Sequence, residues 1–439
     1  MSAPALSPGT DLSQEIAAAA FDRLRTRARG EAGWLQELRR EAFARFQALG
    51  FPTPHDESWK YTNVAPIARI AWEPVSPDAD SSLPVPAGVA GIRLAFVNGR
   101  WSRALSSSSA LPAGLVVLSL AEALREHPEW LEAHLSKRAA WEKNVFTAWN
   151  TAFLEDGAFV RIARGVAIAG PIHLLFLSEQ TGAPAVSHPR NVIVAERGAQ
   201  ASVVETYVGE GVSLTNSVTE LFVGDGASIE HSKVQRESSD AFHVQTIAAG
   251  LDRGSQFTSH NVALGASLAR TDIGVLFEGE GGDCTLNGLF LGGGAQTLDT
   301  HTIIDHAKPH CTSRELYKGI LDGRSRGVFH GTILVRKDAQ KTDAFQTNKN
   351  LLLSKEALVN STPALEIFAD DVKCRHGSTI GQLDAAALFY LRSRGIGEED
   401  ARALLTWAFA SDVAARLTVP EVRAEVERAL GLRLPGAGS

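Results

Sequence analysis

The sequence predicts a mainly β protein, with a parallel β-helix core and helical regions at both ends. Two observations predict the β-helix. From about residue 155, short β-branched and alternating runs are separated by Gly-rich or polar clusters that recur about every 13 residues. No proline occurs from residue 190 to residue 308, as expected where most backbone N–H groups donate to a neighbouring strand. A β-sandwich is the alternative fold, but we would expect stronger hairpin signals from it.

The first region, residues 1–150, is predicted to be mixed and largely helical. Seven of the eight tryptophans precede residue 150, so this region differs in composition from the repeat that follows it. Periodicity and turn residues predict helices over about residues 12–29 and 34–49 and just after Pro128, and strands over residues 91–101 and 114–120.

Two further regions complete the predicted organisation. The β-helix core is expected over residues 151–383 and a helical region over residues 384–439. In the latter, three acidic residues open a helix predicted over residues 398–415, where their charge favours a helix N-terminus. A final helix is predicted to end near Leu430.

Composition excludes several classes of function. Lys plus Arg number 43 against 50 Asp plus Glu, a net charge of -7, and no basic run stands out, so nucleic acid is not an expected partner. Three widely spaced cysteines suit neither a disulfide framework nor a self-contained zinc site, which favours a reducing compartment. The N-terminus lacks the pattern of a secretory signal and no apolar run has the length of a membrane span. We therefore expect a cytoplasmic protein that does not bind membranes.

Cys374 and His376 are the first candidate site. Two residues apart on an extended strand, they are expected to point to the same side, and thiolate and imidazole both suit soft or borderline metals. A closed metal site needs about four ligands, so distant residues or a second chain must complete this one. The alternative is that the pair is structural, with Asp370 and Asp371 as turn residues.

A second group, His301, His306, His310 and Cys311, is dense enough to bind a metal. Its spacing fits no single face of a helix or strand, however, and the alternative is that these are ordinary turn residues.

Cys284 is interpreted as a core thiol. No phosphate-binding loop of the Gly-x-x-x-x-Gly-Lys-Ser/Thr type occurs, so any nucleotide hydrolysis must come from a partner. Four acidic residues leave open an alternative function as a β-helix enzyme acting on polysaccharides: Asp299, Asp305, Asp322 and Asp343.

Several segments resemble a known family. They are residues 59–62, 311–314 with Lys318, 328–331, 341–344, 348–353, 363–377 (which includes Ala-Asp-Asp-Val-Lys-Cys-Arg-His-Gly) and 389–396. Together they resemble the SufB/SufD family of iron-sulfur cluster assembly proteins, and the SufD branch more than the SufB branch.

The resemblance implies a right-handed β-helix that acts as a non-catalytic scaffold subunit. It implies SufB-like and SufC-like (ATPase) partners and a transient iron-sulfur cluster at the interface with the SufB-like chain. His376 is then the metal or cluster residue, and Cys374 belongs to the same motif. The C-terminal helices are expected to bind the ATPase through Leu404, Trp407, Ala408 and Val413. The resemblance is compatible with a complex that contains flavin or lacks it, and with an isolated chain that forms a homodimer or does not.

Overall fold

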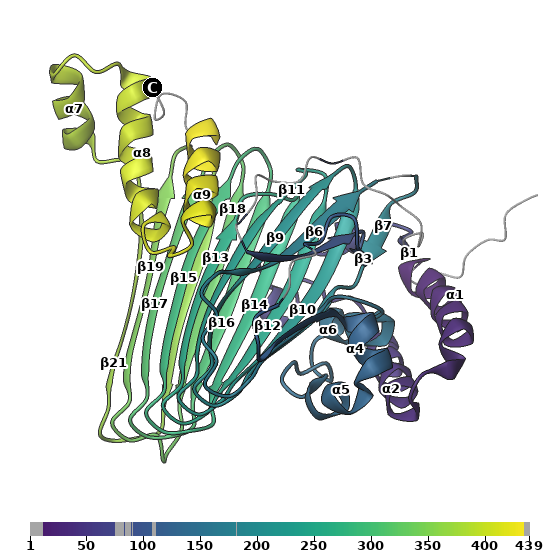
Figure 1. Cartoon of the computed structure of the whole chain (residues 1–439). Coiled ribbons are helices and arrows are strands. Elements are labelled where there is room, and N and C mark those ends of the chain that lie inside the picture. Colours follow the sequence, from purple (N-terminus) through teal and green to yellow (C-terminus); the bar gives the residue numbers. More distant parts are fainter. Residues whose placement is uncertain are drawn as a thin grey trace, which may run out of the picture.

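The computed structural model describes residues 12–74, 83, 89, 91–107, 111–180 and 182–433. Two large parallel sheets face each other along one long axis, with helices at both ends of the chain (Figure 1). The chain passes from one sheet to the other and back, so that each pair of strands forms one coil. The core is therefore a parallel β-helix, as predicted, and the parallel pairing excludes the β-sandwich.

The strands are assigned to the sheets as follows. Sheet A contains β1 (Glu73–Pro74), β4 (Leu115–Ser119), β5 (Ala158–Ile162), β7 (Ala185–Ser187), β8 (Arg190–Ala195), β10 (Ser213–Val223), β12 (Phe242–Leu251), β14 (Leu268–Phe277), β16 (Thr297–His306), β18 (Arg326–Val335) and β20 (Leu358–Ile367). Sheet B contains β2 (Ile92–Val97), β3 (Arg100–Ser102), β6 (Ile172–Glu179), β9 (Gln200–Glu210), β11 (Ser228–Glu237), β13 (Gln256–Ala263), β15 (Asp283–Gly292), β17 (Thr312–Leu321), β19 (Asp343–Leu352) and β21 (Lys373–Gly381).

The spacing of about 13 residues in the sequence corresponds to roughly half of one coil. Leu268 of β14 pairs with Thr297 of β16, which in turn pairs with Arg326 of β18, so one full coil takes about 29 residues. Two strands and two turns occupy each coil. The Gly-rich clusters are thus the turns at which the chain changes sheet.

A column of glycines stacks the turns at one corner of the β-helix. Gly198, Gly226, Gly254 and Gly281 all have positive φ, between 61° and 71°, where a side chain would be strained. Each donates its backbone N–H to a carbonyl of the next coil; for example, the Gly226 N–H donates to the Arg253 oxygen over 2.8 Å. The corner therefore repeats with the same backbone hydrogen bond from coil to coil.

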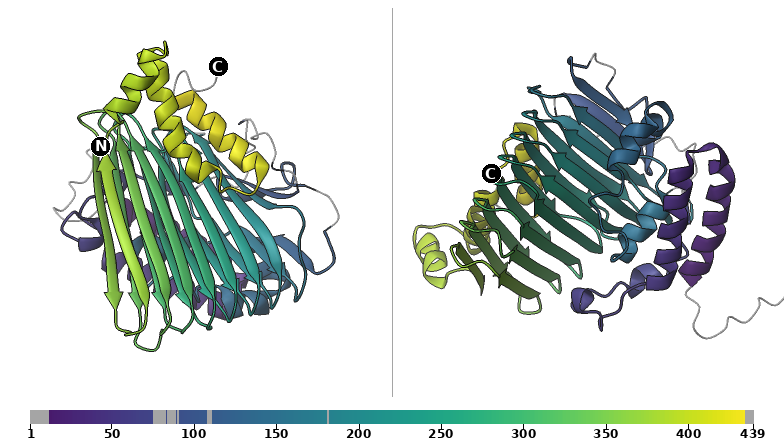
Figure 2. Two further views of the ribbon diagram at one scale, coloured as in Figure 1. Left: turned by 90° about the vertical axis from the view of Figure 1, so that its left-hand side faces the viewer. Right: turned by 90° about the horizontal axis from the view of Figure 1, so that it is seen from below.

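The first coils use strands from the predicted N-terminal region. β2 pairs in parallel with β6, and β4 pairs antiparallel with β5, so both sheets extend into residues 1–150. The helices of this region pack as a layer beside sheet A (Figures 1 and 2). They are α1 (Leu12–Arg27), α2 (Gly33–Leu49), α3 (Ala65–Ala68), α4 (Leu120–Glu126), α5 (Pro128–His134) and α6 (Val145–Phe153), with short 3-10 turns at Ala28–Gly30 and Glu57–Trp59.

A buried ion pair fixes this layer to the sheet. Arg190 and Glu220 have fully buried side chains, and the Arg190 Nη2 donates to the Glu220 Oε2 over 2.6 Å. The Glu220 carboxylate also accepts hydrogen bonds from the backbone N–H groups of Ser136, Arg138 and Ala139. A buried pair is tolerated only when its hydrogen bonds are satisfied, as they are here, so this pair favours a single docking geometry for the loop after α5.

The C-terminal helices are α7 (Ala385–Ser393), α8 (Glu398–Ala414) and α9 (Pro420–Arg433). α8 and α9 pack on the outer face of sheet B, on the opposite side of the β-helix from the N-terminal helices (Figure 2). The predicted regions also include residues 1–11 and 434–439, which lie outside the described residues. In the part of the chain that the structure describes, no helix is long and apolar enough to cross a membrane.

Candidate functional site on the last coil

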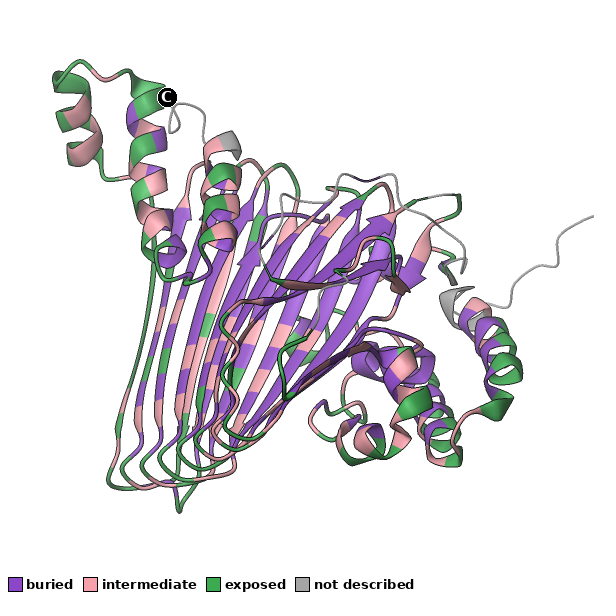
Figure 3. Ribbon diagram, viewed as in Figure 1, coloured by how far each residue is buried: buried purple, intermediate pink, exposed green. Residues whose placement is uncertain are grey.

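The last coil, formed by β20 and β21, ends both sheets. Within the described residues, β20 pairs with β18 and β21 with β19, and neither has a neighbour on its other side. Figure 3 shows the strands at this end as exposed or intermediate, whereas the middle of the β-helix is buried. Large apolar side chains are exposed here: Leu358, Ile367, Phe368 and Ile380. The end therefore presents unpaired backbone groups together with apolar side chains.

The register places Cys374 and His376 on one face of β21. Cys374 lies opposite Ala344 of β19, and His376 lies opposite Gln346. Ala344 and Gln346 are fully buried and face the interior of the preceding coil. Both candidate residues therefore lie on the interior face of the last coil, which no further coil covers.

Their environments differ. Cys374 is partly buried and packs against the apolar cluster that contains Ile333 and Ala344. Burial, followed by the nearby Asp343 carboxylate, raises the pKa of its thiol above the usual value. His376 is exposed. A neutral thiol is a poor metal ligand and an exposed imidazole a ready one, so His376 is the more available donor in the free chain.

A buried acid lies behind His376. Gln346, the register neighbour of His376, donates from Nε2 to the Glu315 Oε2 over 2.6 Å. Glu315 is buried, and desolvation raises its pKa to about 7. The row His376, Gln346, Glu315 therefore leads from the exposed end into the interior.

The acidic turn before β21 is structural. Asp371 forms an ion pair with Lys341, and its backbone N–H donates to the Gln340 Oε1 over 2.9 Å. The Lys341 N–H in turn donates to the Asp371 carbonyl over 2.7 Å. These contacts stack the last turn on the preceding one, as expected for turn residues.

The second histidine group is dispersed. His301 faces outward and stacks on His330, with ring centroids 5.1 Å apart, whereas His306 is buried and contacts the Ser313 hydroxyl. His310 lies in a turn with a φ of 60°, and the Cys311 Sγ contacts two backbone carbonyls. Among the residues described, no group of three or more His, Cys, Asp or Glu is arranged to hold a metal ion. Cys284 is fully buried, as expected for a core thiol.

The four acids of the polysaccharide hypothesis have other partners. Asp299 pairs with Arg270, Asp305 with Arg336 and Asp343 with Arg314. Asp322 accepts a hydrogen bond from the Gly323 N–H in a turn. Asp299 and Asp305 lie six residues apart on β16, about 20 Å along a strand. A catalytic carboxylate pair lies closer than about 10 Å, so Asp299 and Asp305 do not form one.

The predicted ATPase-binding residues lie on α8. Leu404 and Ala408 are exposed, Trp407 is partly buried against sheet B, and Val413 is buried in the cluster beneath the helix. Leu404 and Ala408 are thus the members that a partner can reach in this structure. α7 adds two strongly exposed aromatic side chains, Phe389 and Tyr390.

Sequence reasoning missed a row of polar side chains inside the β-helix. Lys233 lies between Glu205 and Asn261 in the register of sheet B, and further along the same row lie Tyr317, Asn348 and Ser378. The sequence does contain a pattern that predicts this row. Lys233 is four residues from Ile229 on one strand, so it lies on the same face of the strand as a core residue.

Comparison with known proteins agrees with this architecture. Residues 176–409 match the model of the SufBD core domain of SUF system FeS cluster assembly, and residues 22–174 match the SufBD protein N-terminal region. An iron-sulfur cluster assembly SufBD family protein of Synechocystis is 34% identical over 401 residues, 88% of each chain. The iron-sulfur cluster assembly protein SufD of Escherichia coli is 32% identical over 396 residues, 88% of this chain and 90% of that protein. A chloroplastic protein of Arabidopsis thaliana is 30% identical and covers 89% of this chain and 84% of its own length. The chain therefore belongs to the SufBD family of iron-sulfur cluster assembly proteins.

Proposed function

We propose that this chain is a SufD-like, non-catalytic scaffold subunit of a cytoplasmic iron-sulfur cluster assembly complex. In this proposal, the last coil pairs with a SufB-like chain, the C-terminal helices bind a SufC-like ATPase, and a nascent cluster forms at the first of these interfaces. The cluster is cargo of the complex, and His376 is the residue of this chain that contacts it or its iron.

The observation that carries the proposal is the uncovered last coil. A β-helix end with free backbone groups and apolar side chains is suited to pairing with another chain by strand addition. His376 lies on the interior face of that end, so a partner that covers the end also covers His376.

The number of ligands supports a shared site. One exposed imidazole and one recessed thiol cannot close a four-ligand site. A second chain seated on β21 can supply the missing ligands next to His376. Covering Cys374 by a partner that brings metal would also favour loss of its proton, because a metal-bound thiol is deprotonated.

The proposed ATPase-binding surface consists of Leu404, Ala408, Phe389 and Tyr390. All four are exposed on α7 or α8, and such a group of apolar side chains is typical of an interaction surface. The chain lacks a phosphate-binding loop motif, so ATP hydrolysis in this proposal belongs to the partner.

The test is the His376→Ala variant, co-expressed and purified anaerobically with its SufB-like and SufC-like partners. We expect the complex to assemble but to form at least tenfold less cluster, measured by ultraviolet–visible and Mössbauer spectroscopy. Thr379→Ala is the matched control, because Thr379 lies on the opposite face of the same exposed strand.

Full cluster formation in His376→Ala would contradict the proposed site. A complex that does not form with the wild-type chain would contradict the proposed function as a whole. Loss of cluster in both variants would assign the effect to damage of the strand and would also count against His376.

A further inference from the structure

The interior of the β-helix contains a side-chain amide whose oxygen has no partner. Gln346 on β19 is fully buried, and its Oε1 has no hydrogen-bond partner among the residues that the structure describes. Its Nε2 donates to the Glu315 Oε2 over 2.6 Å, so the amide is held through its nitrogen. Buried polar atoms without a partner are rare in folded proteins, so this oxygen requires an explanation.

Gly331 leaves the space that the Gln346 amide occupies. It lies on β18 of the opposite sheet, and a Cβ at this position would lie 2.1 Å from the Gln346 Nε2. Any side chain at position 331 would therefore displace the amide, and glycine permits the close approach. Gly331 and Glu315 together determine where the amide lies.

His376 is placed to donate a hydrogen bond to the free oxygen. It is the register neighbour of Gln346 on β21, on the interior face of the last coil. Neighbouring strands lie about 4.8 Å apart, so an imidazole N–H on this face can reach the side chain beside it. The His376 ring is exposed in the free chain, and a partner seated on the last coil would enclose it against Gln346.

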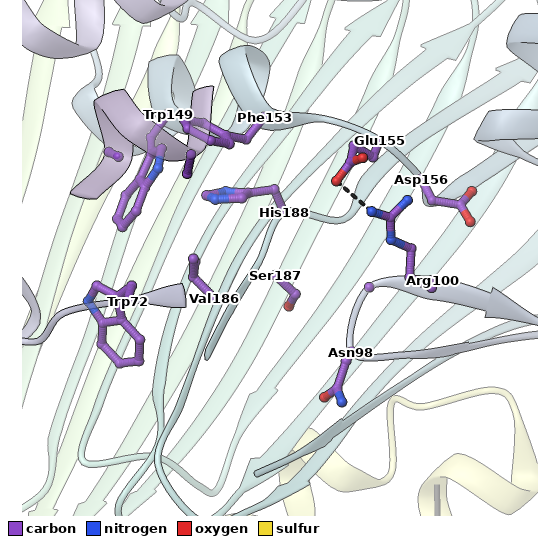
Figure 4. A pocket seen from close by; sticks show the side chains of 13 residues that line it. Trp72, Asn98, Arg100, Trp149, Phe153, Glu155, Asp156, Val186, Ser187 and His188 are labelled. Carbon is purple, nitrogen blue, oxygen red and sulfur yellow. Dashed lines mark hydrogen bonds and ion pairs between the residues drawn. The ribbon is translucent and has the colours of Figure 1, made fainter. Parts of the chain in front are cut away.

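Another unpaired polar atom has a simpler explanation. The Nε2 of His188 also lacks a partner within the described part of the chain, but His188 lines a cavity of about 50 Å³ beside the N-terminal helices (Figure 4). That volume has room for water, which can accept from the His188 ring. For Gln346, the structure instead offers an imidazole on the adjacent strand.

We propose that Gln346 is a positioning residue for His376, an inference that rests on the function proposed above. When a partner covers the last coil, one ring nitrogen of His376 donates to the Gln346 Oε1, and the lone pair of the other nitrogen faces the iron or cluster. Histidines that bind metals commonly donate their second N–H to a carbonyl or carboxylate oxygen, which fixes the tautomer and the orientation of the ring. Gln346 supplies this oxygen, and Glu315 holds the amide in place.

The experiment measures cluster formation in the complex of this chain with its SufB-like and SufC-like partners, reconstituted anaerobically with sulfide and increasing ferrous iron. Gln346→Met keeps the length of the side chain but removes the oxygen. It should raise the iron concentration at half-maximal cluster formation at least tenfold, because losing such a partner weakens metal binding by about 10- to 100-fold. The maximal yield should stay unchanged, whereas general damage to the fold would lower it.

Three further variants locate the effect. Gly331→Ala displaces the amide without changing Gln346 and should also raise the iron concentration required, so it decides the question if Gln346→Met does not fold. Asn348→Leu is the matched control, because Asn348 is equally buried on the same face of β19 but has Ser378 as its register neighbour. Its iron dependence should be that of the wild type. In a His376→Ala chain, Gln346→Met should cause no further change, because its effect depends on His376.

Unchanged iron dependence in both Gln346→Met and Gly331→Ala would overturn the inference, as would an equal rise in Asn348→Leu or a further loss in the double variant. If His376→Ala loses the cluster in the same experiment, the proposed function stands without this inference. Full cluster formation in His376→Ala would overturn both.

Discussion

Lys233 is a titratable side chain enclosed by the β-helix. Its Nζ donates to the Thr271 hydroxyl over 2.8 Å. Desolvation lowers the pKa of Lys233 to about 7, against the opposing attraction of the Glu205 and Glu237 carboxylates. In the unfolded chain the same group has its ordinary pKa of 10.5. Folding therefore releases a proton from Lys233 between about pH 7 and pH 10.5.

This difference predicts a pH dependence of stability. Above pH 7 the unfolded state binds more protons at Lys233 than the folded state, so the free energy of unfolding should rise with pH. The slope from this group is at most about 1.4 kcal/mol per pH unit. Below pH 7 the group is protonated in both states and contributes no slope.

Lys233→Met isolates the effect. Urea unfolding of wild type and variant between pH 6.5 and pH 9.5 should show that the wild-type free energy rises relative to the variant above pH 7. Parallel curves over that range would mean that Lys233 stays charged in the folded protein. Titrating groups on which Lys233 has no influence, such as Glu315, are common to both proteins and cancel in the difference.

For single residues, the sequence predicts which face of a strand a side chain occupies, but not what that side chain contacts. The two-residue spacing of Cys374 and His376 predicts a shared face, and the register shows one. The spacing could not predict that Cys374 packs against a buried apolar cluster while His376 is exposed, because that cluster includes residues far away in the sequence, such as Ala344, 30 positions before Cys374.

For secondary-structure elements, the sequence predicts the helix α8 but not the surface on which it packs. Periodicity predicts a helix over residues 398–415, and the structure has one at Glu398–Ala414. The surface on which it packs depends on β17, far away in the sequence. There the Lys318 Nζ donates to the Phe409 carbonyl over 2.9 Å and lies 2.8 Å from the Asp412 carboxylate. A lysine on a strand gives no sequence signal for such a contact.

Lys318→Met should loosen this helix. Methionine keeps the length of the stem but loses the charge, which hydrogen-bonds to Asp412 and lowers the pKa of that carboxylate. Because Asp412 is half exposed, we expect a loss of only about 1–2 kcal/mol. Hydrogen exchange across α8 and α9 should accelerate more than in the β-helix.

Lys349→Met is the matched control, because Lys349 is the register neighbour of Lys318 on β19, is exposed, and attracts the Asp412 carboxylate more weakly than Lys318 does. Its exchange pattern should resemble that of the wild type. Equal acceleration in both variants, or none in Lys318→Met, would show that apolar packing alone holds α8 on sheet B.

For the whole molecule, the repeat in the sequence predicts the β-helix but not where it starts. The first coils recruit β2 and β4 from a region whose composition separates it from the repeat. Those strands belong to the sheets only through pairing with β6 and β5, which local patterns do not record. The other end is easier to predict, because the repeat simply stops after β21.

That open end predicts self-association of the isolated chain. β21 has an unpaired edge in the described structure, and Ile380 on it is 52% exposed. Two copies can cover both edges and the apolar side chains by pairing end to end. Ile380→Lys should weaken this association at least tenfold, because a charged side chain at a strand edge opposes pairing. Sedimentation equilibrium over a range of concentrations measures the change.

Ile303→Lys is the control. Ile303 is also 52% exposed but lies on β16, which has neighbouring strands on both sides, so its variant should associate like the wild type. A wild-type chain that remains monomeric at high concentration, or equal weakening by both variants, would contradict association through the last coil.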